Sequence, residues 1–170
     1  MRILGIDPAL KITGYGVITL AVKGGQDLAG SRKKFFLQEA GIITTSAREP
    51  LPQRLERIYE AAMKLVSDTR PDVVVLEKLY AHYRHPTTAY ILGQARGIIC
   101  LVAARKKLPL VEYSATRVKK AIVGKGLAPK SQVQQMVAHL LGLKSLPKYT
   151  DVTDALALAI AHSYIVRFQI

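Results

Sequence analysis

Residues 2–20 read RILGIDPALKITGYGVITL. The apolar run at residues 2–7 predicts a strand that ends at Asp7, and residues 14–20 predict its hairpin partner. Residues 23–32 are glycine-rich and polar, which is typical of a loop. A third strand is expected at residues 35–45, where two apolar patches alternate imperfectly with polar residues. We therefore expect the sheet to begin with antiparallel strands.

A second apolar run, residues 73–77, reads VVVLE and closes on Glu77. Its unbroken apolar character predicts a strand buried on both faces, as in a parallel sheet covered by helices. Apolar residues at helical spacing after Pro52 predict a helix that precedes this strand in the sequence. The remaining expected elements are a helix of about twenty residues from Thr87, a strand at residues 108–113, short helical and loop segments, a helix opening at Pro129, and a last helix from about Asp151 to Val166.

The order of these elements, β-β-β-α-β-α-β-α-α, predicts the fold class. We expect an α/β fold with a five-stranded mixed sheet flanked by helices, in which the first three strands are antiparallel and the later ones parallel. The 170 residues show no internal repeat, low-complexity tract or linker. A single domain is therefore expected over residues 1–170.

The chain is strongly basic. It carries 25 Lys and Arg against 12 Asp and Glu, which gives a formal net charge of +13. Such a charge attracts polyanions over a long range and favours a nucleic-acid partner. A ribosomal or architectural protein would show the same excess, so charge alone does not predict an enzyme.

The single cysteine, Cys100, excludes an internal disulfide and is typical of a protein of the reducing cytoplasm. No charged and apolar leader precedes the first strand, so no secretory signal is expected. The most apolar long stretch, residues 89–104, contains Gln94 and Arg96 and is too short and polar to span a membrane. We expect a cytoplasmic protein.

Four of the twelve acids stand where folding alone gives little reason for them. Asp7 and Glu77 each close a strand, and parallel neighbouring strands would bring both carboxylates to one edge of the sheet. Asp151 and Asp154 are three residues apart and so share one face of a helix. Four carboxylates in one place would form the oxygen-rich site that Mg²⁺ or Mn²⁺ prefers.

Two such ions roughly 3.5–4 Å apart can activate a water and stabilise the leaving oxygen when a phosphodiester is hydrolysed. The sequence has no Cys-x-x-Cys or His-Glu-x-x-His pattern, which argues against zinc. Taken singly, the acids also have ordinary explanations. Asp7 precedes a proline and could cap a turn, while Asp151 and Asp154 could complement a helix dipole. Glu112 ends the fifth strand without an evident partner, and we interpret it as structural.

Residues 78–85, KLYAHYRH, place aromatic and basic side chains directly after Glu77. Tyr80 or Tyr83 could stack on an unpaired base, and Arg84 could bind a phosphate. The alternative is a solvated loop with one tyrosine packed on the core. Position beside Glu77 favours a DNA contact for Tyr80, whereas Tyr83 stays open between the two interpretations. Arg84 is expected to bind a phosphate, and the two histidines of the loop are interpreted as surface residues.

Two glycine patterns resemble known motifs. Residues 124–131, GKGLAPKS, approach the phosphate-binding loop of nucleotide hydrolases, but Pro129 replaces its last glycine and has no N–H to offer. Proline instead suits the first turn of a helix, which would place Lys130 where a DNA phosphate binds well. Gly93 and Gly97 predict the close approach of another backbone, from the same chain or from a second subunit.

Taken together, these stretches resemble the RuvC family, the bacterial Holliday-junction resolvases. The resemblance covers nearly the whole chain and keeps the family's order. It rests on residues 3–8 and 13–17, Glu77 after the valine run, LGQARG at 92–97, residues 118–124, KSQVQ at 130–134 and DVTDALA at 151–157.

The resemblance implies a ribonuclease H-like fold and a homodimer that uses two Mg²⁺ ions per active site to nick two symmetrically related strands of a four-way DNA junction. Mn²⁺ would substitute for Mg²⁺, and the branch-migration proteins RuvA and RuvB would be partners. The family's catalytic and metal-binding acids fall on Asp7, Glu77, Asp151 and Asp154, of which Asp151 is the most replaceable. Its DNA-contacting residues fall on Lys119, Lys130 and the aromatic position Tyr80.

Other functions stay open at this point. A nuclease of the same fold that cuts RNA–DNA hybrids would use the same acids. A non-catalytic basic protein that binds junctions or RNA would carry them only as structural residues. An actin-like ATPase shares the glycine-rich first hairpin, but it needs a second phosphate motif and about twice the length.

Overall fold

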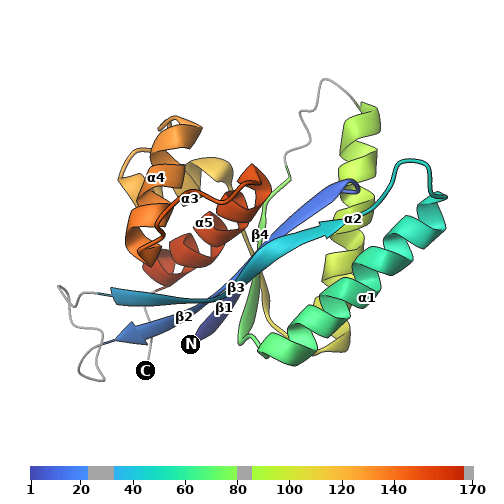
Figure 1. Ribbon diagram of the computed structural model, residues 1–170, viewed down its shortest axis with the longest axis horizontal. Coiled ribbons are helices and arrows are strands. Elements are labelled where there is room, and N and C mark those ends of the chain that lie inside the picture. Colours follow the sequence, from blue (N-terminus) through green and yellow to red (C-terminus); the bar gives the residue numbers. More distant parts are fainter. Residues whose placement is uncertain (23–32, 80–85, 167–170) are drawn as a thin grey trace.

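The computed structural model describes residues 1–22, 33–79 and 86–166. Within these residues the sheet has the strand order β3-β2-β1-β4-β5, and helices cover both of its faces (Figure 1). The elements are β1 (Arg2–Asp7), β2 (Ile12–Val22), β3 (Lys33–Thr44), α1 (Leu51–Thr69), β4 (Val73–Glu77), α2 (Pro86–Arg105), β5 (Leu110–Tyr113), α3 (Ala115–Val123), α4 (Lys130–Leu141) and α5 (Thr150–Ile165).

The pairing of the strands confirms the predicted mixed sheet. β2 is antiparallel to both β1 and β3, whereas β4 is parallel to both β1 and β5. The two apolar runs that close on Asp7 and Glu77 are therefore parallel neighbours at the centre of the sheet. Their carboxyl ends lie at the same edge.

A β-bulge explains the imperfect alternation of the third strand. Val17 pairs with Glu39 and Ile18 with Leu37, so Gln38 has no opposite residue on β2. An extra residue in one strand reverses the side-chain alternation from that point on. The two apolar patches that the sequence shows are the segments on either side of Gln38.

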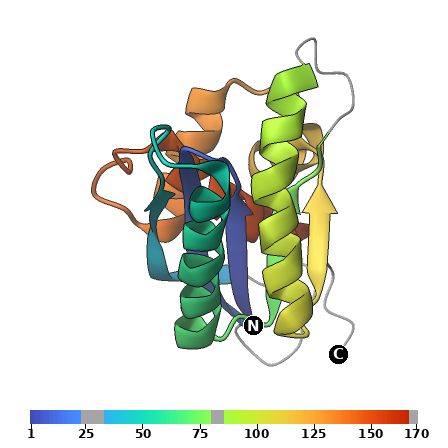
Figure 2. The ribbon, with the colours of Figure 1, turned by 90° about the vertical axis from the view of Figure 1, so that its right-hand side faces the viewer.

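Two apolar cores form, one on each face of the sheet. Val73 and Val75 of β4 pack with α3, α4 and α5, and Val74 and Leu76 pack with α1 and α2. Figure 2 shows α1 and α2 side by side over the second face. All four of these side chains are at most 5% exposed, which confirms the prediction that β4 is buried on both faces.

The structure differs from the sequence-based expectation in the bounds of several elements. The short helical segment expected before α4 is a regular nine-residue helix, α3, which the expected order of elements leaves out. β5 begins at Leu110 rather than residue 108, because Pro109 has no N–H and joins the sheet only through its carbonyl, which accepts from Val74 N at 2.9 Å. Residues 23–32, expected to form a loop, lie outside the described residues.

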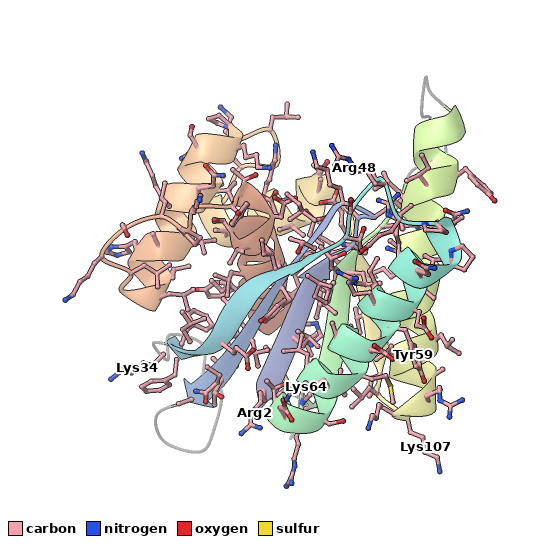
Figure 3. The ribbon with its side chains drawn as sticks, turned by 45° about the vertical axis from the view of Figure 1, so that its right-hand side comes forward. Arg2, Lys34, Arg48, Tyr59, Lys64 and Lys107 are labelled. Carbon is pink, nitrogen blue, oxygen red and sulfur yellow. The ribbon has the colours of Figure 1, made fainter. Side chains whose placement is uncertain are left out.

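Positive side chains are distributed over several sides of the molecule. Figure 3 shows Arg2 and Lys34 toward the amino end of β1 and Arg48 toward its carboxyl end. Cys100 is half-buried in α2 and forms no disulfide. None of the helices in the described ranges has the length and hydropathy needed to cross a membrane.

Candidate active site

Asp7 and Glu77 lie next to each other at the carboxyl edge of the sheet. Ile6 of β1 is in register with Leu76 of β4, and each of the two acids is the next residue of its strand. Their charges interact, since the carboxylate of Glu77 raises the pKa of Asp7. The structure thus brings the two strand-end acids together as the parallel pairing predicts.

A glycine on the neighbouring strand lets the other two acids approach. Gly14 of β2 pairs with Asp7, and a Cβ atom added to Gly14 would lie only 2.2 Å from the backbone oxygen of Asp151. Any side chain at this position would therefore push the first turn of α5 away from the sheet. The sequence Gly14-Tyr15-Gly16 contains the glycine that this approach needs. Considered alone, however, the pattern predicts only a strand and not the contact with α5.

The four acids form one electrostatic group. Burial raises the pKa of Asp7 from 3.8 to about 7, with further contributions from the carboxylates of Asp154, Glu77 and Asp151. Burial and Asp154 also raise the pKa of Glu77. Burial and repulsion between neighbouring carboxylates both favour the protonated form of a carboxyl group. This edge of the sheet therefore favours the binding of a positive charge.

Two lysines lie against the acids. Lys130 Nζ is 2.5 Å from Asp154 Oδ2, and the charge of Lys119 lowers the pKa of Glu77. Burial alone would lower the pKa of Lys130, but its hydrogen bond to Asp154 and the surrounding carboxylates raise it. Both lysines line a cavity of about 160 Å³ together with Glu77 and Asp154. The structure thus places Lys119 and Lys130, the expected DNA contacts, at the acidic centre.

The residues of this centre fit a hard divalent cation. All four donors are carboxylates, which Mg²⁺ and Mn²⁺ prefer. Burial, together with the charges of neighbouring carboxylates, raises the pKa values of Asp7 and Glu77. Within residues 1–22, 33–79 and 86–166, no three His, Cys, Asp or Glu side chains are close enough together to hold an ion as they stand. The Lys130 ammonium pairs with Asp154 in this arrangement, so binding of an ion there requires Lys130 to move.

Arg96 on α2 is a residue of the site that sequence analysis missed. Its Nη1 donates to the backbone oxygen of Glu77 at 2.7 Å, and its Nη2 forms an ion pair with Glu112 of β5. The sequence shows no evident partner for Glu112, and this ion pair agrees with its interpretation as a structural residue. Arg96 also borders a second cavity, which Asp7 and Glu77 line from the sheet. The guanidinium ties α2 and β5 to the end of β4, from which Glu77 projects.

Arg96→Ala is expected to destabilise the fold around Glu77. It leaves the Glu77 carbonyl without this donor and Glu112 without its counter-ion, which costs about 1–3 kcal/mol of unfolding free energy. Arg105→Ala is the matched control, because it removes the same charge from the exposed end of the same helix. Urea denaturation at pH 7 measures both variants. If Arg96→Ala and Arg105→Ala have the same free energy of unfolding, Arg96 does not stabilise the end of β4.

Some expected site residues are not described by the structure. Tyr80 and Arg84, the predicted DNA contacts of the loop after Glu77, lie outside the described residues, and so do Tyr83 and the two loop histidines. Their roles stay predictions. Around Gly93 and Gly97 the described part of the chain has no atom within 4 Å of an added Cβ. Close approach of a backbone from the same chain is therefore not found there.

Comparison with known proteins agrees with this geometry. The family model described as "Crossover junction endodeoxyribonuclease RuvC" matches residues 3–162. The chain is 43% identical over 168 residues to the RuvC of Brevibacillus brevis, with 99% of this chain and 95% of the relative covered. It is 42% identical over 163 residues to the RuvC of Rhodopirellula baltica, with 96% and 86% covered.

The fold agrees with solved structures as well. Thermus thermophilus RuvC superposes with a TM-score of 0.85 at 33% identity and 96% and 94% coverage. Its complex with a Holliday junction substrate also gives 0.85, at 34% identity and 97% and 94% coverage. The yeast mitochondrial Holliday junction resolvase, at 14% identity and a TM-score of 0.59 over 94% of this chain and 76% of its own, shares the fold alone. These likenesses confirm the predicted ribonuclease H-like sheet. The chain belongs to the RuvC family of crossover junction endodeoxyribonucleases.

Proposed function

We propose that this protein resolves Holliday junctions by hydrolysing one phosphodiester in each of two symmetrically related strands. The observation that carries the proposal is the acidic centre, in which burial and three other carboxylates raise the pKa of Asp7 to about 7. Such a concentration of negative charge, in a chain whose net charge is +13, is what a metal-dependent nuclease needs and what a simple DNA-binding protein avoids. One domain over residues 1–170 would carry this activity.

Asp7, Glu77, Asp151 and Asp154 would hold the divalent ions of the reaction, which we propose to be two Mg²⁺ per site. When bound, these ions supply Lewis acidity and an activated water for in-line attack on phosphorus. The chain's own contribution is to place the carboxylates on two strand ends and one helix face, at the edge of the sheet where the ions would bind. Mn²⁺ has the same preference for oxygen ligands and is expected to substitute.

Lys119 and Lys130 would direct the DNA backbone onto these acids. Lys130 lies at the start of α4, where the helix dipole also favours a phosphate group. In this structure its ammonium pairs with Asp154. We infer that Lys130 would be free to bind a phosphate near the scissile bond when Asp154 holds an ion. Tyr80 and Arg84 would add stacking and phosphate contacts from the loop after Glu77.

We also propose a homodimer built on α2. Tyr90, Gly93, Gly97 and Leu101 follow one another at intervals of three or four residues and are exposed, Tyr90 by 68% and Leu101 by 48%. The two glycines leave open space at the helix surface. A second copy of this helix would cover the stripe, and a two-fold dimer would present two active sites to a two-fold junction. RuvA and RuvB as partners, and a cytoplasmic location, stay predictions.

Side-by-side cleavage of three substrates tests the proposal. A mobile four-way junction, an RNA–DNA hybrid and a plain duplex are incubated with the protein in Mg²⁺. We expect cleavage of the junction and none of the other two at matched concentration. Preferential cleavage of the hybrid would favour the ribonuclease alternative, and loss of cleavage on all three would favour a non-catalytic basic binding protein.

A further inference from the structure

The loop between α3 and α4 carries an apolar side chain that is held out into solvent. Leu127 is 85% exposed, more than any other large apolar residue in the described part of the chain. A single exposed leucine is ordinary on a protein surface and carries no meaning alone. Two features make Leu127 a candidate contact residue: the residues on either side of it are anchored on the protein, and the loop ends at the acidic centre.

Both neighbours of Leu127 are anchored on the protein. A Cβ on Gly126 would lie 2.6 Å from Thr116 Cγ2 and 3.2 Å from the Thr116 backbone oxygen, so the Gly126 backbone lies directly on the first turn of α3. Ala128 is 1% exposed and belongs to the core beneath α3 and α4, and its N–H donates to the Lys125 oxygen at 3.2 Å. Leu127 therefore projects outward because the chain on either side of it is fixed.

The loop leads straight into the acidic centre. Lys130, three residues after Leu127, begins α4 and pairs with Asp154. Three residues span at most about 11 Å between Cα atoms. Since phosphates of one DNA strand follow at about 3.4 Å of helix rise, Leu127 lies within a few nucleotides of any phosphate held at the acids. Lys125 is also exposed on this loop, so the apolar side chain of Leu127 lies between two lysines in the sequence, Lys125 and Lys130.

The two kinds of side chain recognise different features of DNA. Lysines bind phosphates, which a duplex and a four-way junction present alike. An apolar side chain gains from contact with base faces, which stacking covers in a continuous duplex and which become accessible where stacking is interrupted at the exchange point of a junction. Leucine is among the residues that proteins insert at unstacked base steps.

We propose that Leu127 contacts unstacked bases beside the scissile phosphate and thereby favours a four-way junction over a continuous duplex. This proposal rests on the proposed function. In this proposal the loop between α3 and α4 provides selectivity for junctions over duplexes, whereas the positive charge of the protein provides most of the affinity for DNA. Leu127 is exposed, and the loop is anchored by Gly126 and Ala128 on either side of it. Substitutions of Leu127 are therefore expected to leave the fold intact.

Equilibrium binding without divalent ions tests the proposal on the full chain. Dissociation constants of Leu127→Ala, Leu127→Gln and Leu127→Met are measured for a four-way junction and for a duplex of equal mass, each at several salt concentrations. We expect Leu127→Ala and Leu127→Gln to bind the junction roughly tenfold more weakly, with duplex binding unchanged. Leu127→Met keeps the apolar bulk and should bind the junction as the wild type does.

The salt dependence separates this role from a charge effect. The slope of log affinity against log salt should stay the same in the Leu127 variants, whereas Lys125→Ala should weaken both substrates and reduce the slope by about one. Wild-type affinity of Leu127→Ala for the junction, or an equal loss on junction and duplex, would overturn the proposal. A wild-type protein without any preference for the junction would overturn the proposed function itself and this role with it.

Discussion

Asp7→Asn is expected to bind a Holliday junction as tightly as the wild-type protein does and to cut it at least about a thousandfold more slowly. The substitution removes one negative charge and one ion-binding oxygen at Asp7, where burial and the other carboxylates raise the pKa to about 7, with almost no change of shape. Loss of about 4 kcal/mol of transition-state stabilisation corresponds to a thousandfold in rate, and a divalent ion contributes several kcal/mol of this kind. Binding is retained because the lysines and the loop contacts are untouched.

Single-turnover cleavage of a labelled junction measures the rate, and a gel-shift in EDTA measures binding. Asp68→Asn is the matched control, because this acid lies on the exposed side of α1 in a surface ion pair with Lys64. It should cut at the wild-type rate. An Asp7→Asn protein that cuts as fast as the control would show that the acids at the strand ends do not hold the catalytic ions.

The metal-free protein is expected to lose stability between about pH 4 and pH 8 and to regain it when Mg²⁺ is added. The pKa of Asp7 is about 7 in the folded protein against an ordinary value of 3.8. Between these two values the folded state keeps a proton that the unfolded state has released. Stability is therefore fully present below about pH 4 and falls as the pH rises through 7.

This loss amounts to at most about 4 kcal/mol, since one pKa unit corresponds to 1.36 kcal/mol. The raised pKa of Glu77 acts in the same direction. Lys130 does not offset it in this range, because its pKa is raised above an already high value and its contribution disappears only in strong alkali. Ions that bind the folded state alone reverse the loss, by about 2.7 kcal/mol at a hundred times their dissociation constant.

Thermal melts at pH 5 and pH 8, with EDTA or with millimolar Mg²⁺, check this prediction. Millimolar Mg²⁺ should raise the melting temperature at pH 8 by several degrees, roughly 2–4 °C per kcal/mol for a chain of this size. In EDTA at pH 8, Asp7→Asn should melt above the wild type, because the buried charge is gone, and it should respond less to Mg²⁺. A wild-type melting temperature that ignores both pH and Mg²⁺ would contradict a shared carboxylate site.

Much of the fold follows from local patterns in the chain. The runs that end at Asp7 and Glu77 predict two strands, and the structure shows β1 and β4 as parallel neighbours. The bulge at Gln38 was visible only as imperfect alternation, because the pattern shows that the side chains change faces but not which residue is unpaired. Before α4 the sequence predicts short helical segments without bounds, because α3, at nine residues, is too short for a clear periodicity.

The site was predictable where its residues stand at ends of elements and not where they depend on packing. Asp151 and Asp154 share a helix face by spacing alone, but their approach to Asp7 depends on Gly14, whose missing side chain lets α5 reach the sheet. Arg96 is nineteen residues from the carbonyl that it binds. No local pattern indicates such a contact, since it arises only when α2 packs on the sheet.

Strand-resolved analysis of the cleaved junction tests the central claim most directly. Each of the four strands of a mobile junction is labelled in turn, and the products made in Mg²⁺ are separated on a denaturing gel. If Asp7 and its three neighbours form one metal-dependent centre in each subunit of a dimer, two strands of like polarity should be nicked at symmetric positions, and Asp7→Asn should nick none. Nicks in all four strands at unrelated positions, or paired nicks that persist in Asp7→Asn, would contradict the account.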